Sequence, residues 1–167
     1  MSNSFEILMN QLGMPAEMRQ APALAQADIE RVVVHKISKV WEFHFVFSNI
    51  LPIEIFLELK KGMREEFSKT GNKAIFEIKA LSQEFSNQLL QSYYREAFSE
   101  GPCASQGFKS LYQNLRVRAE GNQLFIEGSE AIDKEHFKKN HLPNLAKQLE
   151  KFGFPAFNCQ EIGRAHV

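Results

Sequence analysis

Carboxylates, histidines and cysteines are the side chains of this sequence that could do chemistry, and their spacing argues against an active site. Two-metal phosphoryl chemistry needs several carboxylates converging on two ions. This chain has only two aspartates, Asp28 and Asp133, one in each half. One of the closest acidic clusters, Glu65-Glu66, lies among lysines and arginine, as on the exposed face of a helix. We therefore expect a solvated helix face there and no metal site.

The histidines form no recognised ligand or catalytic pattern. His35 and His44 lie on neighbouring predicted strands and could approach each other, yet no third ligand stands at a suitable spacing. His136 and His141 are five residues apart and lack the glutamate of the H-E-x-x-H pattern. We expect His44 to be a half-buried structural residue.

The sequence also lacks the usual nucleophile and phosphate-binding motifs. Cys103 and Cys159 lie far apart with no base partner, which favours two free, reduced thiols. No G-x-x-x-x-G-K-[ST] loop, no G-x-G-x-x-G after a strand and no G-x-S-x-G elbow occurs. We therefore expect no catalytic residue, no metal ligand and no cofactor, and this chain alone is not expected to be an enzyme.

Bulk composition predicts a folded protein with a phenylalanine-rich core. The 167 residues are 44% hydrophobic and 24% charged, with 15 Phe and a single Trp. Residues 1–80 and 81–167 each carry ten Lys or Arg and ten Asp or Glu, so neither half has the bulk positive charge of a dedicated nucleic-acid binder. Met1–Asn10 lacks the regions of a signal peptide, and no apolar run reaches the ~20 residues that span a bilayer. We expect a cytoplasmic protein without a membrane partner.

Hydrophobic periodicity divides the first half into the helices and strands that would position any functional group. A β-branched run, Arg31–His35, is typical of a buried strand, and Val40–Phe47 alternates with four aromatic side chains on one face. The helix that begins at Pro52 is expected to cover this aromatic face. The predicted elements are, in order, helix 4–12, a short helix at Pro15, strands 31–35 and 40–47, helix 52–69 and strand 74–80.

The sequence of the second half predicts a similar order of helices and strands. We expect an α+β protein of two small modules, residues 1–80 and 81–160, each of α-α-β-β-α-β order with an antiparallel sheet covered by helices. This order is similar to that of KH-like replication adaptor domains. Residues 161–167, EIGRAHV, resemble a translated sequencing adapter and are expected to be a non-native tail. The second module is predicted to contain helices 83–98, 106–114 and 132–152 and strands 115–119, 123–127 and 156–159.

Two groups of residues are candidates for binding. One would form a basic face for phosphate groups if the first hairpin turn adjoins the long helix. The other is the apolar side of the first helix, which either docks a partner or closes the core of the first module. For the basic group, the alternative is ordinary solubilising side chains. The basic candidates are Lys36, Lys39, Lys60, Lys61 and Arg64, and the apolar candidates are Phe5, Leu8, Met9 and Leu12.

The stretch Val34–Phe67, VHKISKVWEFHFVFSNILPIEIFLELKKGMREEF, resembles the start of PolC-type DNA polymerase III. The resemblance rests on the strand Trp41–Phe45, WEFHF, followed by Leu51-Pro52 and an aromatic-bearing helix. The hairpin 121–124, GNQL, and the helix end 152–155, FGFP, are supporting matches. The likeness covers nearly all of residues 4–160.

The resemblance implies a fragment from the non-catalytic amino-terminal region of a large replicative polymerase of low-GC Gram-positive bacteria. In that family this region precedes an OB-fold domain, a PHP domain with an inserted proofreading exonuclease, and the polymerase domains. No residue of DNA synthesis or of 3′–5′ proofreading can therefore be assigned here. The family's amino-terminal region is regarded as an interaction module, which implies replisome proteins, such as the clamp-loader tau subunit, or DNA as partners. A protein-binding module is favoured, and a nucleic-acid-contacting module is the alternative.

Overall fold

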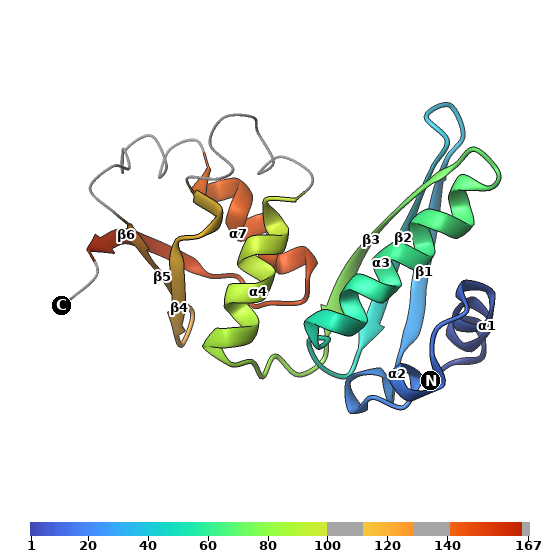
Figure 1. Ribbon diagram of the computed structural model, residues 1–167, viewed down its shortest axis with the longest axis horizontal. Helices are drawn as coiled ribbons and strands as arrows, with labels where there is room; N and C mark the ends of the chain where they lie inside the picture. Colours follow the sequence, from blue (N-terminus) through green and yellow to red (C-terminus); the bar gives the residue numbers. More distant parts are fainter. Residues whose placement is uncertain (100–111, 129–140, 165–167) are drawn as a thin grey trace. The chain divides into compact units, whose positions relative to one another are not determined.

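The computed structural model describes residues 1–99, 112–128 and 141–164, which belong to two compact units (Figure 1). The first unit comprises Met1–Glu84 with Lys151–Gly153, and the second comprises Phe85–Glu150 with Phe154–Val167. Each unit has a three-stranded sheet and helices, so the predicted α+β class is confirmed. Cys103, most of the predicted helix 106–114 and the start of the predicted helix 132–152 lie outside the described residues.

The first unit is built on a sheet with the strand order β1-β2-β3. Its first helix begins at the N-cap Ser2, whose hydroxyl accepts a hydrogen bond from the Phe5 amide, and ends at Gly13 in the left-handed conformation. The elements are α1 (Asn3–Leu12), α2 (Ala16–Arg19), a 3-10 turn (Pro22–Leu24), β1 (Asp28–His35), β2 (Val40–Phe47), α3 (Ile53–Ser68) and β3 (Lys73–Ala80).

The third strand runs parallel to the second, so the expectation of purely antiparallel sheets is wrong. β1 and β2 pair antiparallel, but Val40 lies opposite Lys73 and Phe47 lies opposite Ala80 in a parallel register. The reason is the length of the connection. The 16 residues of α3 carry the chain back along the sheet before β3 begins, which is the geometry of a β-α-β crossover.

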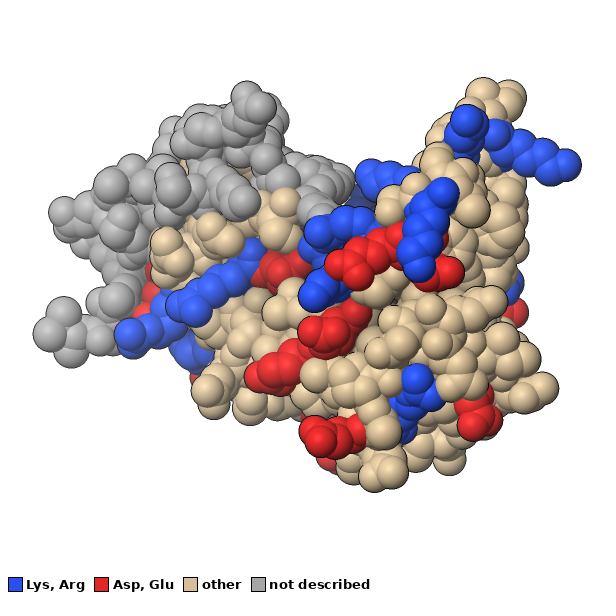
Figure 2. Space-filling view, turned by 45° about the vertical axis from the view of Figure 1, so that its right-hand side comes forward, with Lys and Arg blue, Asp and Glu red and all other residues tan. Residues whose placement is uncertain are grey.

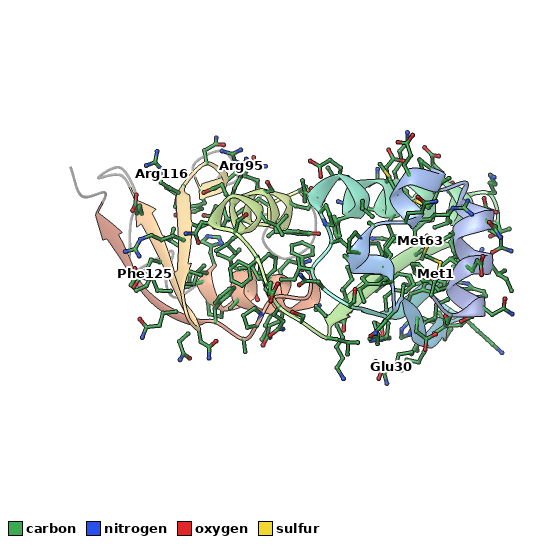
Figure 3. All side chains as sticks on the ribbon, turned by 90° about the horizontal axis from the view of Figure 1, so that it is seen from below. Met1, Glu30, Met63, Arg95, Arg116 and Phe125 are labelled. Carbon is green, nitrogen blue, oxygen red and sulfur yellow. The ribbon has the colours of Figure 1, made fainter. Side chains whose placement is uncertain are left out.

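The aromatic face of β2 is covered as the sequence predicts. Phe43 and Phe45 are buried, and Phe67 of α3 lies edge-on to Phe43 with ring centroids 5.3 Å apart. Phe5 of α1 packs edge-on against Phe45 at 5.6 Å. Met63 of α3, labelled in Figure 3, is also buried inside this unit. Helices α1 and α3 therefore close the core over one face of the sheet.

The second unit has the same β-β-α-β arrangement in its described residues. Strands β4 and β5 pair antiparallel, and β5 and β6 pair parallel. The expected pair of KH-like modules is wrong, because that expectation required antiparallel sheets and both sheets are mixed. β6 includes residues 161–164 of the stretch expected to be a non-native tail. The elements are α4 (Asn87–Ala97), β4 (Arg116–Glu120), β5 (Gln123–Gly128), α7 (Leu142–Lys151) and β6 (Asn158–Arg164).

Candidate functional site

Two of the basic candidates lie at one end of the first sheet. Lys36 and Lys39 are exposed in the turn between β1 and β2. The structure adds a lysine that sequence reasoning missed, because the backbone amide of Lys73 donates to the carbonyl of Lys39 at 2.9 Å. Only the parallel register of β3 brings Lys73 to this end, and no sequence pattern reveals that register. We call Lys36, Lys39 and Lys73 the tip lysines.

The other three basic candidates, Lys60, Lys61 and Arg64, lie on α3. They share that helix with four glutamates, so the segment carries three cations, four carboxylates and a net charge of −1. Figure 2 likewise shows Lys and Arg side chains next to Asp and Glu side chains at several places on the visible surface. The helix therefore does not form a basic face by itself.

The apolar candidates on α1 belong to the core of the first unit. Phe5, Leu8 and Met9 are no more than 6% exposed. Leu12 packs against α3 so closely that a Cβ added at Gly62 would lie 3.2 Å from the Leu12 Cβ. Core closure therefore accounts for these side chains.

The prediction of a buried strand at Arg31–His35 is wrong, because β1 is an exposed edge strand. It pairs only with β2. Val32 and Val34 lie opposite Phe43 and Trp41, so they are on the face that carries α3, yet they are 39% and 42% exposed. The turn that follows β1 carries a fully exposed Ile37. Ile37, an apolar side chain in a predicted turn, is the one sequence signal for this exposed apolar surface.

The regular part of the exposed edge begins after a bulge. The β1–β2 register shifts between Ile29 and Arg31, which leaves the exposed Glu30 outside the ladder (Figure 3). Within the described residues, the one side chain that hydrogen-bonds the backbone of β1 is Asp28, which accepts from the Ile29 amide at 2.8 Å. We call Arg31–His35 the β1 edge.

The outer edge of β4 in the second unit is blocked by side chains of α4. Gln91 accepts from the Val117 amide at 2.9 Å and donates to the Leu115 carbonyl at 2.9 Å. Asn87 accepts from the Ala119 amide at 3.0 Å. These amides occupy backbone groups that an added strand would need, and Figure 1 shows α4 beside β4.

The β3 edge of the first sheet is protected in another way. Lys73 and Lys79 lie on it, and lysines on an edge strand disfavour pairing with another chain. The segment Lys151–Gly153 of the same unit also lies against this strand, since a Cβ added at Gly153 would be 3.3 Å from the Ala80 Cβ. In the part of the chain described, β1 is the one of these three edges that has neither side-chain amides bonded to its strand, as β4 has, nor edge lysines and a covering segment, as β3 has.

The face of the sheet opposite the helices carries a histidine–glutamate network. His44 Nε2 lies 2.7 Å from a Glu42 oxygen, and its Nδ1 lies 3.6 Å from Glu77. The hydrogen bond with His44, followed by the charges of His44, His35 and Arg31, holds the pKa of Glu42 below its usual value despite partial burial. The His44 side chain is 13% exposed, which agrees with the structural role expected for it.

The described residues show neither a metal-binding cluster nor a membrane-spanning helix. Among the described residues, no group of three or more His, Cys, Asp or Glu side chains could hold a metal ion. Over the same residues, no helix has the length and apolar character to cross a membrane.

Two protein families match consecutive parts of the chain. The family described as DNA polymerase III polC-type N-terminus I matches residues 4–78, and the family described as DNA polymerase III polC-type N-terminus II matches residues 92–161. No solved structure matches the chain.

Curated relatives named DNA polymerase III PolC-type are similar over nearly the whole chain. A protein of Streptococcus pneumoniae serotype 2 (strain D39) is 96% identical over 160 residues, which is 96% of this chain and 11% of the relative. A protein of Streptococcus sanguinis (strain SK36) is 64% identical over 159 residues, covering 95% of this chain and 11% of the relative. The chain thus spans about a tenth of the length of these relatives. The two family matches and these identities show that the chain belongs to the amino-terminal region of the PolC-type DNA polymerase III family.

Proposed function

We propose that this chain is the non-catalytic interaction region of a replicative DNA polymerase and that it binds another replisome protein. The whole polymerase would carry out DNA-templated synthesis with 3′–5′ proofreading in the cytoplasm. The observation that supports protein binding is the β1 edge, where Val32 and Val34 are exposed on a strand that pairs with β2 on one side only. Exposed apolar side chains on a free strand edge favour pairing with another chain.

The first experiment measures binding to purified replisome proteins. The whole chain is immobilised and titrated with the clamp-loader tau subunit, then with the other replication proteins of the same organism, by biolayer interferometry. We expect at least one of them to bind saturably with a Kd in the micromolar range, about −8 kcal/mol. Failure of every protein to bind below about 100 µM would refute the proposal.

A second candidate function, contact with nucleic acid, is favoured by the tip lysines. Three phosphates neutralised on a single strand would give a salt slope of about −2, so binding should weaken by about 20-fold between ~50 and ~200 mM salt. Fluorescence anisotropy with a labelled single-stranded oligonucleotide measures this slope. Intact tau binding without salt-dependent oligonucleotide binding would remove this candidate.

A further inference from the structure

We infer that the β1 edge accepts an extended acidic segment of the partner protein, which adds to the first sheet as a fourth strand beside β1. The inference deepens the proposed protein-binding function and rests on it. The occupant is defined by its chemistry: a segment with apolar residues at alternate positions and carboxylates between and beside them.

The backbone of the β1 edge supports strand addition. Arg31–His35 is regular after the bulge at Glu30 and pairs with β2 on one side only. Five residues are a usual length for a strand, and main-chain hydrogen bonds supply much of the affinity when a peptide extends a sheet. The edges of β3 and β4 carry lysines, a covering segment or side-chain amides, so β1 is the edge that remains open among them.

The two faces of β1 select different side chains in an added strand. Val32 and Val34 present apolar surface on the face that carries α3, and the fully exposed Ile37 extends this surface into the turn. Side chains of an added strand alternate between the two faces. Apolar residues at every second position would therefore lie beside Val32 and Val34.

The charges near the edge select an acidic partner. From residue 31 to residue 39 the sequence RVVVHKISK contains Arg31, Lys36 and Lys39 and no Asp or Glu. Arg31 lies opposite His44, on the face away from α3. Glu42 of β2 shares that face and lies 4.0 Å from His35, so carboxylates of an added strand would meet cations at Arg31 on the outer strand and at the lysines of the turn.

The same charges favour an acidic strand over a second copy of this chain. Antiparallel pairing of two β1 edges about Val33 would place Arg31 of each copy opposite His35 of the other. It would also put Glu30, which stands opposite Lys36 of the other copy in that register, on the bulge outside the ladder. An acidic segment instead meets a cation both on the strand and at the turn.

The experiment uses the whole chain and two synthetic peptides of about ten residues, one alternating valine with glutamate and the other alternating valine with lysine. Binding is followed by the fluorescence of Trp41, the single Trp of the sequence, which lies opposite Val34. Amide hydrogen exchange then reports which strand gains protection. The Val32→Glu/Val34→Glu variant removes the apolar surface and places carboxylates on the edge, and Ile75→Glu is the matched control because Ile75 is 39% exposed on β3.

We expect saturable binding of the valine–glutamate peptide, with new protection at Arg31–His35. Val32→Glu/Val34→Glu should weaken this binding at least about tenfold, and Ile75→Glu should change it by less than about twofold. The valine–lysine peptide should bind at least about tenfold more weakly than the acidic one. The Lys36→Glu/Lys39→Glu variant, in the exposed turn, should also weaken binding of the acidic peptide. This second test is valid even if the valine variant does not fold.

Several outcomes would overturn the inference. They are no saturable binding of the acidic peptide, equal binding of both peptides, or new protection on β3 instead of β1. Sedimentation showing a dimer that is lost in Val32→Glu/Val34→Glu would assign the edge to a second copy and equally reject the acidic partner. If tau or another replisome protein binds this variant as well as the unaltered chain, the inference fails and the proposed function stands. If no replisome protein binds the unaltered chain, the proposed function itself fails.

Discussion

Truncation of Phe5 tests whether α1 closes the core of the first unit or is displayed to a partner. The Phe5 ring is 0% exposed and packs edge-on against Phe45 and Phe47, with centroids 5.6 and 5.5 Å away. Because the whole ring is removed from a sealed site, Phe5→Ala should lower the free energy of unfolding by about 3–5 kcal/mol. Phe5→Leu keeps most of the apolar volume and loses the ring pairs, so it should cost about 1–2 kcal/mol.

Urea unfolding followed by tryptophan fluorescence measures these changes in the unit concerned. Trp41 is the only Trp in the sequence and lies on β2, so the transition reports the first unit and not the second. If the denaturant slope is unchanged, the shift in midpoint gives the change in free energy directly. Ile7→Ala is the control on the same helix, because Ile7 is 52% exposed and should cost less than about 0.5 kcal/mol.

A small effect at Phe5 would refute this reasoning. If Phe5→Ala cost less than about 1 kcal/mol, or no more than Ile7→Ala, the ring would not be part of a sealed core. The apolar side of α1 would then again be a candidate docking surface for a partner.

Three further predictions concern the other contacts described. Because the Glu42 pKa is lowered in the folded chain, its contribution to stability should be full above the ordinary value of 4.5 and be lost as pH falls through the lowered value. The stability difference between the native chain and Glu42→Gln, measured by urea unfolding, should therefore shrink in acid. Gly62→Leu should destabilise the first unit by about 1–3 kcal/mol in the same assay, because Leu12 already lies within contact of a Cβ at this position. Gln91→Leu should cost about 1–3 kcal/mol by circular dichroism melting, because it deprives the Val117 amide of β4 and the carbonyl of Leu115, just before that strand, of their partner.

The controls for these predictions come from neighbouring positions. Gln88→Leu changes an exposed amide on α4 and should leave the melting curve nearly unchanged, so an equal effect of both glutamine variants would contradict edge blocking. A Glu42→Gln effect that grows as the pH falls has the wrong sign for a carboxylate with a lowered pKa. A neutral Gly62→Leu would mean that α1 and α3 are not in close contact.

Local patterns predicted much of the first unit, because they depend on neighbours within one element. The predictions that β2 alternates and that its aromatic face is covered are both confirmed. The first helix begins at Asn3, one residue before the predicted start, because Ser2 caps it and a serine at either position fits a capping pattern. The resemblance at Val34–Phe67 also led to the right family.

The sequence by itself therefore determined the family, the α+β class and the burial of Phe43, Phe45 and Phe47. Only the tertiary structure decided that β3 runs parallel to β2, that Lys73 joins Lys39 at the tip, and that β1 is exposed. The physical reason is that a period of two residues tells which side chains share a face, but not which strand lies alongside or how far a helix extends over the sheet. A run of valines has the same pattern on a covered strand and on an open edge. The sequence pattern therefore could not show that the β1 edge is exposed and is the candidate binding site.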